Sequence, residues 1–390
     1  MIFNTFNYYF LFLLPAALLF KLASARWRPW VLILSASGFY IYFSLHGFGG
    51  IAGAFCLSIF LWECAVSRLY RPGASICLLG VLQSIAFLAV FKYWNYLTGL
   101  LWSLRSSNPW HWSGAFLPLG ISFFTFEFIH YAVDRYRGKT SDGAASEYLA
   151  FIMFFPTMVA GPIKRYEDFL PKLRAADATL IDVQSGITRI LVGLVKKLAI
   201  ADLMTAYTNH LNAADIATAD RRVLPLWLLA YGVKIYFDFS GYSDIAIGSA
   251  RLFGIRVPEN FDWPYFRTNI SQFWRNWHIS LSAWLLDYVF IPLGGSHVVR
   301  YRIYTNLLVT MFVSGVWHGA GTNFIVWGLW HGTLLAGHRI WRDLRGARQT
   351  SAAGDIAAAI LTFLLVNLGW AFFCMDLPTV RLFLLRMFLG

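Results

Sequence analysis

The sequence predicts an all-α, polytopic membrane protein, and three observations lead to this fold class. The chain is 58% hydrophobic and only 13% charged, which is too apolar for an ordinary soluble domain. Apolar runs of spanning or near-spanning length recur along it, and short basic groups separate them. Because backbone inside a bilayer must satisfy its own hydrogen bonds, these runs are expected to be helices.

The apolar runs predict roughly ten membrane spans, because ~20 apolar residues cross a bilayer and some runs are short, tilted or re-entrant. They cover residues 7–20, 29–45, 48–66, 74–91, 115–133, 148–160, 186–203, 223–239, 304–317, 322–337 and 355–374. The sequence has no internal repeat and no long polar linker, so residues 1–390 are expected to form a single integral-membrane domain.

The basic residues lie between the apolar runs and do not form one patch. The net charge is +12, and the groups around Arg26, Arg68 and Arg135 each follow an apolar run. Since cytoplasmic loops are rich in Lys and Arg, these groups are expected to be cytoplasmic, with the N-terminus outside. The distribution favours a lipid bilayer as the partner and argues against nucleic acid.

The sequence lacks the cysteine pairs and short motifs that are typical of metal binding, nucleotide binding and serine hydrolases. The four cysteines form no CxxC pair and are expected to be packed thiols. There is no HExxH, P-loop, GxGxxG or GxSxG string. No metal site is therefore expected.

The centre of the chain, residues 156–294, alternates apolar helices with polar and aromatic segments. Irregular or charged backbone at membrane depth is tolerated only where protein or a watery cavity surrounds it. The segments therefore suggest an internal chamber or funnel. The charged residues there are expected to face one another or water: Asp238, Asp244, Arg251, Glu259, Asp262, Arg275 and Asp287.

Two histidines occur in "SGVWHGAGTNFIVWGLWHG", residues 314–332. On one unbroken helix, His318 and His331 would lie about 220° apart, so they would not share a site unless Gly319 and Gly321 break the helix. His331 and His338 are the more natural pair on one face. The small residues around His318 predict room for a ligand beside it.

A further histidine, His278, lies in the aromatic stretch "FWRNWHISLSAW". At helical spacing Trp274, Trp277 and His278 share a face, which predicts an amphipathic segment along a cavity wall or the membrane interface. Without metal-ligand spacing, a buried imidazole able to act as a base is what these residues offer.

Long strings then resemble one family. "LPLGISFFTFEFIHYAVDRYRG", "FFPTMVAGPIKRYEDFLPKL", "YFDFSGYSDIAIGSARLFGI", "PENFDWPYF", "FWRNWHISLSAWLLDYVFIPLGGS" and the two-histidine string occur in order. Together they resemble the bacterial branch of the membrane-bound O-acyltransferase (MBOAT) family, which includes the membrane subunit of alginate O-acetyltransferase. The sequence departs from the family by having Asn276, Leu286 and Cys374 where an arginine is common.

The resemblance implies an MBOAT-type helical bundle, with re-entrant or interfacial helices around a central funnel. It implies that His318 is the active-site histidine and that His278 fills the second active-site position. A neutral imidazole can take the proton of an attacking hydroxyl, a role worth about 10² to 10⁴ in rate. The remaining candidates are substrate-binding residues and two basic contacts for the phosphates of coenzyme A: Trp277, Trp317, Gly319, Gly321, Asp238 and Arg275, then Lys164 and Arg165.

The resemblance also implies the reaction partners. We expect an O-acyltransferase of the bacterial cell inner membrane that uses acyl-CoA, with acetyl-CoA expected, as co-substrate and has no bound cofactor. The acyl group would reach an exported polysaccharide, as in alginate biosynthesis, through a periplasmic partner of SGNH type. Two alternatives stay open: acyl or D-alanyl transfer to peptidoglycan or teichoic acid, and a polytopic transporter whose buried charges form a substrate path.

Overall fold

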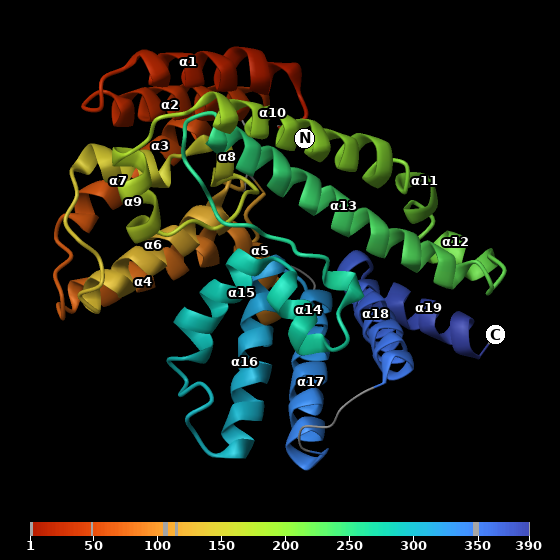
Figure 1. Cartoon of the computed structure of the whole chain (residues 1–390). Helices are drawn as coiled ribbons and strands as arrows, with labels where there is room; N and C mark the ends of the chain where they lie inside the picture. Colours follow the sequence, from red (N-terminus) through yellow and green to blue (C-terminus); the bar gives the residue numbers. More distant parts are fainter. Residues whose placement is uncertain (1–2, 48–49, 104–107, 114–115, 346–350, 390) are drawn as a thin grey trace. The chain divides into compact units, whose positions relative to one another are not determined.

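The computed structural model describes residues 3–47, 50–103, 108–113, 116–345 and 351–389 (Figure 1). Within these ranges the regular elements are helices, and the β structure is one isolated bridge between Phe261 and Trp277. The expected all-α fold class is thus confirmed for the described residues. Contacts divide the chain into unit 1, Met1–Leu194 with Tyr242–Pro258, and unit 2, Val195–Gly241 with Glu259–Gly390.

Unit 1 is built from the N-terminal helices around its own hydrophobic core. Helix α2 packs against α1, α3 and α7, and α4 packs against α6. The elements are η1 (Tyr8–Leu13), α1 (Leu14–Leu22), α2 (Arg28–Gly47), α3 (Gly50–Ser67), α4 (Ile76–Leu88), η2 (Ala89–Tyr93), α5 (Trp94–Leu101), α6 (Ile121–Tyr136), α7 (Ala145–Ile152), α8 (Phe155–Met158), α9 (Tyr166–Arg174) and α10 (Leu180–Leu194).

A distant segment completes unit 1. The last part of α13 (Leu224–Arg251) belongs to it, together with the residues up to Pro258. The hydroxyl of Tyr8 donates to Ser249 over 3.0 Å, and Arg189 pairs with Asp244 over 2.5 Å. A Cβ on Gly248 would lie 2.5 Å from the carbonyl oxygen of Gly186, so the glycine permits close approach of α10 and α13.

Unit 2 has a separate core, formed chiefly by residues of its C-terminal helices. Asn269, Ser351 and Asp376 begin helices by accepting a backbone N–H with their side-chain oxygens, which is the usual N-cap arrangement. The elements, besides most of α13, are η3 (Val195–Ala201), α11 (Thr205–Thr208), α12 (Ala213–Thr218), η4 (Pro264–Phe266), α14 (Ile270–Asn276), α15 (Ile279–Leu285), η5 (Leu286–Phe290), α16 (Arg300–His318), α17 (Thr322–Arg345), α18 (Ala352–Cys374) and α19 (Leu377–Phe388).

Helices α16 and α17 form a tight hairpin, and they lie side by side in Figure 1. Two glycines face each other along it. A Cβ on Gly315 would lie 2.3 Å from the carbonyl oxygen of Phe324, and one on Gly328 would lie 2.4 Å from that of Met311. Small residues at these positions therefore allow the two backbones to touch.

Two described helical segments are long and apolar enough to cross a membrane: Ile76–Leu101, which runs from α4 through α5, and Ala352–Cys374. Shorter apolar helices are Tyr8–Leu22, Gly53–Ser67 and Ile279–Phe290. Large apolar side chains are exposed along both long segments, at Leu78, Leu79, Leu82, Ile85, Ile356, Ile360, Leu361 and Leu364. Such faces are typical of contact with lipid. The number of about ten spans stays a prediction.

The apolar run at residues 148–160 is not one helix, which corrects the expectation from sequence. Helix α7 ends at Ile152, Phe154 has extended backbone, and the four-residue helix α8 follows with Pro156 in its first turn. A proline has no backbone N–H to donate to the carbonyl four residues earlier, here that of Ile152, and its ring clashes with that carbonyl, so α7 cannot continue through Pro156. The run at 223–239 extends instead, because α13 continues to Arg251.

Candidate active site

The imidazole of His318 lies where a helix breaks. Helix α16 ends at His318, Gly319 has extended backbone with φ −165°, and α17 begins at Thr322. The ring of His318 is partly exposed. Its centroid lies 4.7 Å from that of Trp317, 4.8 Å from that of Trp327 and 5.1 Å from that of Phe373. An aromatic wall thus surrounds a side chain that can still be reached.

The second candidate, His278, lies at an elbow between α14 and α15. The stretch is not the single amphipathic helix expected from sequence, because Trp277 is extended and His278 has a left-handed φ of 44°. Trp277 forms the isolated antiparallel bridge with Phe261. Pairing with a neighbouring segment therefore overrides the helical periodicity at this point.

Asn260 fixes this elbow from the neighbouring segment. Its carbonyl oxygen accepts the amide N–H of Ile279 over 3.0 Å. Its side-chain oxygen accepts the hydroxyl of Ser280 over 2.6 Å and the Ser280 amide over 3.3 Å. Asn260 and His278 are both buried. The contacts that Asn260 makes with the two residues after His278 thus hold the backbone of the elbow.

Trp317 contacts both candidate histidines. Its ring centroid lies 6.2 Å from that of His278 and 4.7 Å from that of His318. On its other side, His278 lies 4.6 Å from the ring of Phe239. The structure therefore brings His278, Trp317 and His318 together, although Trp317 comes 39 positions after His278 in the chain. A site with one buried and one partly exposed imidazole results.

The two histidines of α17 have different neighbours. His331 is buried and lies 4.9 Å from the ring of Trp327, the same indole that contacts His318. His338 instead contacts Ser271 over 3.3 Å and stacks on Trp341. His331 and His338 both lie on α17, seven residues apart as expected for one face, but their side chains contact different groups.

Several buried polar atoms here have no hydrogen-bond partner among the described residues. They are both ring nitrogens of His278 and of His331, the indole nitrogens of Trp274 and Trp327, and the hydroxyl of Ser314. Leaving such a group unpaired costs about 1–3 kcal/mol, and native proteins rarely gather several of them. Water or a polar group of a substrate is the partner that their chemistry requires.

The glycines beside His318 serve close packing and leave no open space at their own Cα atoms. A Cβ on Gly319 would lie 2.1 Å from the ring of Phe324, and one on Gly321 would lie 2.4 Å from the side chain of Asn323. The interpretation that these glycines leave room for a ligand is therefore wrong. Phe324 fills that space and contacts Phe373, which in turn contacts His318.

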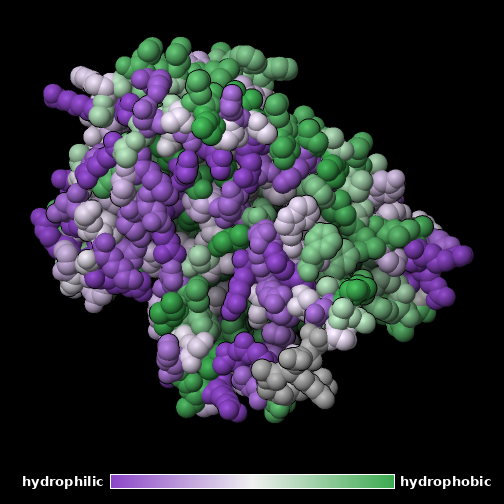
Figure 2. Space-filling model, in the orientation of Figure 1, coloured by the Kyte–Doolittle hydropathy of each residue, from purple (hydrophilic) through white to green (hydrophobic). Residues whose placement is uncertain are grey.

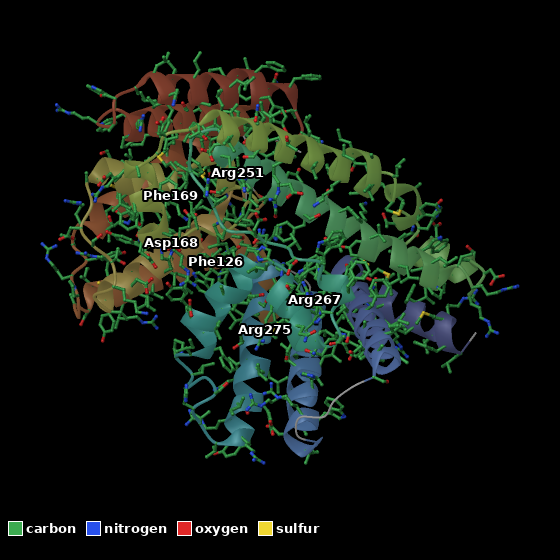
Figure 3. All side chains as sticks on the ribbon, viewed as in Figure 1. Phe126, Asp168, Phe169, Arg251, Arg267 and Arg275 are labelled. Carbon is green, nitrogen blue, oxygen red and sulfur yellow. The ribbon has the colours of Figure 1, made fainter. Side chains whose placement is uncertain are left out.

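The other candidates in unit 2 take different positions. Trp277 is buried and stacks on Phe273, whereas Arg275 is exposed on α14 (Figure 3). Asp238 pairs over 2.7 Å with Lys197, which also binds Asp202 over 2.5 Å. The ion pairs of Asp238, Asp244 and Asp262 agree with the expectation that these charges face partners.

The two proposed coenzyme A contacts lie in unit 1 and differ in accessibility. Lys164 is buried, and its ammonium pairs with Glu127 over 2.5 Å. It also lies 4.6 Å from the ring of Phe151 and 5.8 Å from that of Phe169, which Figure 3 shows on α9. Arg165 is partly exposed at the start of α9.

Sequence reasoning missed the aromatic residues that join the histidines. Phe239, Phe261, Trp327 and Phe373 contact His278, Trp277 or His318, yet none was singled out. Trp327 offered a signal, because it lies four residues before His331 and therefore on the same helical face. Phe373 offered none, since it comes from α18, more than fifty residues after His318.

The apolar helices with exposed apolar faces indicate an integral membrane protein, in which two candidate histidines share one aromatic cluster. Residues 54–375 match the membrane-bound O-acyltransferase family, MBOAT. The chain belongs to this family and is an O-acyltransferase, which decides against the transporter alternative.

The chain is similar in sequence to three members of the family. The probable alginate O-acetylase of Pseudomonas aeruginosa is 38% identical over 381 residues, covering 96% of this chain and 72% of the relative. That of Azotobacter vinelandii is 37% identical over 382 residues, covering 96% and 75%. The peptidoglycan O-acetyltransferase of Helicobacter pylori is 34% identical over 329 residues, covering 76% and 61%.

Proposed function

We propose that this protein moves an acetyl group from cytosolic acetyl-CoA across the bacterial inner membrane toward an exported polysaccharide, through a periplasmic partner of SGNH type. The observation that carries the proposal is the placement of His318 and His278 on one indole, Trp317, in an O-acyltransferase. The similarity to alginate O-acetylases supports acetyl as the group and a polysaccharide as the acceptor.

His318 acts as the general base in this mechanism. The acceptor hydroxyl oxygen attacks the thioester carbonyl carbon while its proton moves to the neutral imidazole. The carbon–sulfur bond then breaks, the ester is released, and the imidazolium returns its proton to the thiolate of coenzyme A. The partly exposed ring of His318 suits this role, since the base must reach the hydroxyl within hydrogen-bond distance.

His278 serves as the second active-site group. Its ring is buried, and its nitrogens have no partner in another described residue, so an N–H there can donate to the thioester oxygen as negative charge develops. Preorganised donors of this kind are worth about 3–4 kcal/mol in acyl transfer. We further propose that donor and acceptor reach the two histidines from opposite membrane faces through a funnel.

The test uses the full chain in proteoliposomes with radiolabelled acetyl-CoA and a soluble hydroxyl acceptor. His318→Ala should lower the transfer rate at least about 100-fold, as expected for loss of a general base. His338→Ala is the matched control, because it removes a histidine of the same region that bonds Ser271. Transfer by His318→Ala at the control's rate would refute the assignment.

A second acceptor class has its own support, because the Helicobacter pylori relative is named for acetyl transfer to peptidoglycan. The assay separates the two when alginate-type oligosaccharides and peptidoglycan fragments are supplied together with candidate SGNH partners. Preferential acetylation of the polysaccharide supports our proposal, and preferential acetylation of peptidoglycan replaces its acceptor. A D-alanyl thioester, offered in place of acetyl-CoA, tests the alternative in which D-alanine is transferred to teichoic acid.

The proposed contact with coenzyme A rests mainly on Arg165. Lys164 is held by Glu127 in a buried pair, whereas Arg165 is partly exposed. Arg165→Ala is therefore expected to raise the KM for acetyl-CoA and leave kcat near that of the wild type. An unchanged KM would remove Arg165 from the donor site.

A further inference from the structure

Unit 1 contains an open cavity of about 520 Å³ that the acyl-transfer proposal does not use. It lies between the α1–α2 connection, the start of α7 and the end of α9, and its lining includes Arg26, Trp30, Asp142, Glu147 and Arg174. Figure 2 shows hydrophilic residues gathered over α7 and α9 on this face, next to apolar residues over α1. The cavity thus borders both polar and apolar surface.

The cavity is lined by two arginines, Arg26 and Arg174, and two acidic residues, Asp142 and Glu147. Arg174 binds Glu147 through two hydrogen bonds of 2.6 and 2.8 Å, and Arg135 pairs with Asp142 over 2.7 Å. These two pairs neutralise the acidic residues. Two more guanidinium groups are then present, because Arg68 donates to the carbonyl oxygen of Gly143 and Arg26 lines the cavity.

Arg26 is the residue that points to a ligand. It is exposed, and it has no hydrogen-bond or ion-pair partner among the described residues. A guanidinium offers five N–H donors in a planar fork that matches the oxygens of a phosphate. Because both acidic residues of the lining are already paired with other arginines, Arg26 is left uncompensated and favours a phosphate over a neutral or cationic ligand.

Two tryptophans place this cavity at the level of lipid head groups. Trp27 and Trp30 are 59% and 45% exposed, and the apolar helix α2 begins between them at Arg28. Exposed tryptophans are enriched at the interface between membrane and water. Arg26, Arg68 and Arg135, which mark the three basic groups expected to be cytoplasmic, each line the cavity or bind a residue that lines it.

We propose that this cavity binds a phosphate group at the cytoplasmic membrane surface, namely the phosphodiester of an anionic phospholipid head group. Arg26 contacts the phosphate oxygens, Trp30 covers the glycerol region, and the acyl chains lie along the apolar start of α2. Basic pockets on the cytoplasmic side of helical membrane proteins bind anionic lipids in this manner. The phosphates of coenzyme A share this chemistry and are the alternative source.

The experiment measures binding of two probes to the detergent-purified full chain by native mass spectrometry. The probes are phosphatidylglycerol and coenzyme A, and diacylglycerol, which has the same tails without phosphate, is the blank. Arg26→Ala should weaken phosphatidylglycerol binding about 10-fold, the equivalent of one lost charge-assisted contact. Arg26→Lys should fall between it and the wild type, because it keeps the charge without the fork.

Arg71→Ala is the matched control, since Arg71 is an exposed arginine of the same end that does not line the cavity. It should leave phosphatidylglycerol binding within about 2-fold of wild type, a difference below about 0.5 kcal/mol. Loss of coenzyme A binding in Arg26→Ala, with lipid binding intact, supports the phosphate site and assigns it to the donor. If Arg26→Ala and Trp30→Ala both bind the two probes as Arg71→Ala does, the site is refuted. None of these outcomes depends on acyl transfer.

Discussion

Among single residues, His278 has the most constrained backbone in the candidate site. Its φ of 44° lies in the left-handed region, which costs a non-glycine residue on the order of 1–2 kcal/mol. The contacts of Asn260 with Ile279 and Ser280 hold this conformation. Strain of this kind gathers at functional sites, and here the backbone and the imidazole of one residue can be tested separately.

His278→Gly and His278→Ala are expected to separate the two contributions. Both variants remove the imidazole and should lose most of the acyl transfer. Glycine accepts a positive φ without strain, so His278→Gly should be more stable than His278→Ala by about 1 kcal/mol. Thermal unfolding in detergent and the transfer assay measure the two effects. Equal stability of the variants would mean that the backbone relaxes on substitution.

Single residues also show how far sequence reasoning reaches. The strings around His318 and His278 are enough to mark both histidines as candidates. Their common contact with Trp317 depends on the chain leaving the helix at Trp277 and again after His318, and periodicity does not predict such breaks. The prediction of open space at Gly319 was wrong for a related reason. Phe324 occupies that space because the chain turns between α16 and α17.

At the level of elements, the α16–α17 hairpin depends on glycines at defined positions. Gly328 and Gly337 lie on the same helix but meet different surroundings. A Cβ on Gly328 would lie 2.4 Å from the carbonyl oxygen of Met311, whereas one on Gly337 would meet no atom of the described residues within 4 Å outside its own helix backbone. Substituting alanine at Gly337 therefore tests helix propensity alone, whereas substituting it at Gly328 also tests the contact between α16 and α17.

Gly328→Ala is expected to destabilise the protein, and Gly337→Ala to stabilise it. The first forces α16 and α17 apart and should cost about 1–3 kcal/mol, the range for overpacking. The second gains up to about 1 kcal/mol, because alanine is the better helix former. Thermal unfolding of the two variants beside the wild type tests this. A stabilising Gly328→Ala would show that the hairpin is looser than described.

Helices α7 and α9 are joined by the ion pair of Glu147 with Arg174. Hydrogen bonds from Arg174 hold the pKa of Glu147 below its ordinary value. A lowered pKa in the folded state means that the pair stabilises the protein above the ordinary pKa of a glutamate. That stabilisation is lost as the pH falls through the pKa of the folded state.

Glu147→Gln should therefore lower the unfolding temperature at pH 7, by an amount equivalent to about 0.5–1 kcal/mol for a partly exposed pair. The difference from wild type should shrink as the pH is lowered below the range in which glutamates titrate. Asp168→Asn, which changes an exposed carboxylate on α9 (Figure 3), is the control and should follow the wild type at each pH. A pH-independent effect of Glu147→Gln would mean that the ion pair with Arg174 is not the source of the stabilisation.

At the scale of the whole molecule, exposed apolar faces and basic ends match a protein placed in a bilayer. Composition predicted the helices, and most of the apolar runs correspond to helices with ends close to those expected. The run at 148–160 failed because Pro156 breaks it, although its residues are as apolar as those of a span. Hydropathy indicates that a segment is apolar. Whether that segment forms one continuous helix depends on backbone restrictions such as those of proline.

The orientation in the membrane can be tested at Arg71 and Lys139, which are exposed beside the connections of Arg68 and Arg135. In a chain whose own cysteines are replaced by serine, Arg71→Cys and Lys139→Cys should react with a membrane-impermeant maleimide only after the cytoplasmic side is opened. Retention of basic residues on the cytoplasmic side is the physical reason. Labelling of both in intact spheroplasts would invert the topology.

Because unit 1 consists of two separate stretches of the chain, it cannot be completed until the second stretch has been synthesised. The ribosome completes α10 well before it makes the segment that supplies Ser249 to Tyr8 and Asp244 to Arg189. At about 5–20 residues per second, the nascent helices wait several seconds for that segment. During this interval the charged side chain of Arg189 has no Asp244, and the face of Gly186 has no Gly248 against it. A nascent chain that stalls before residue 242 thus lacks the segment that completes unit 1.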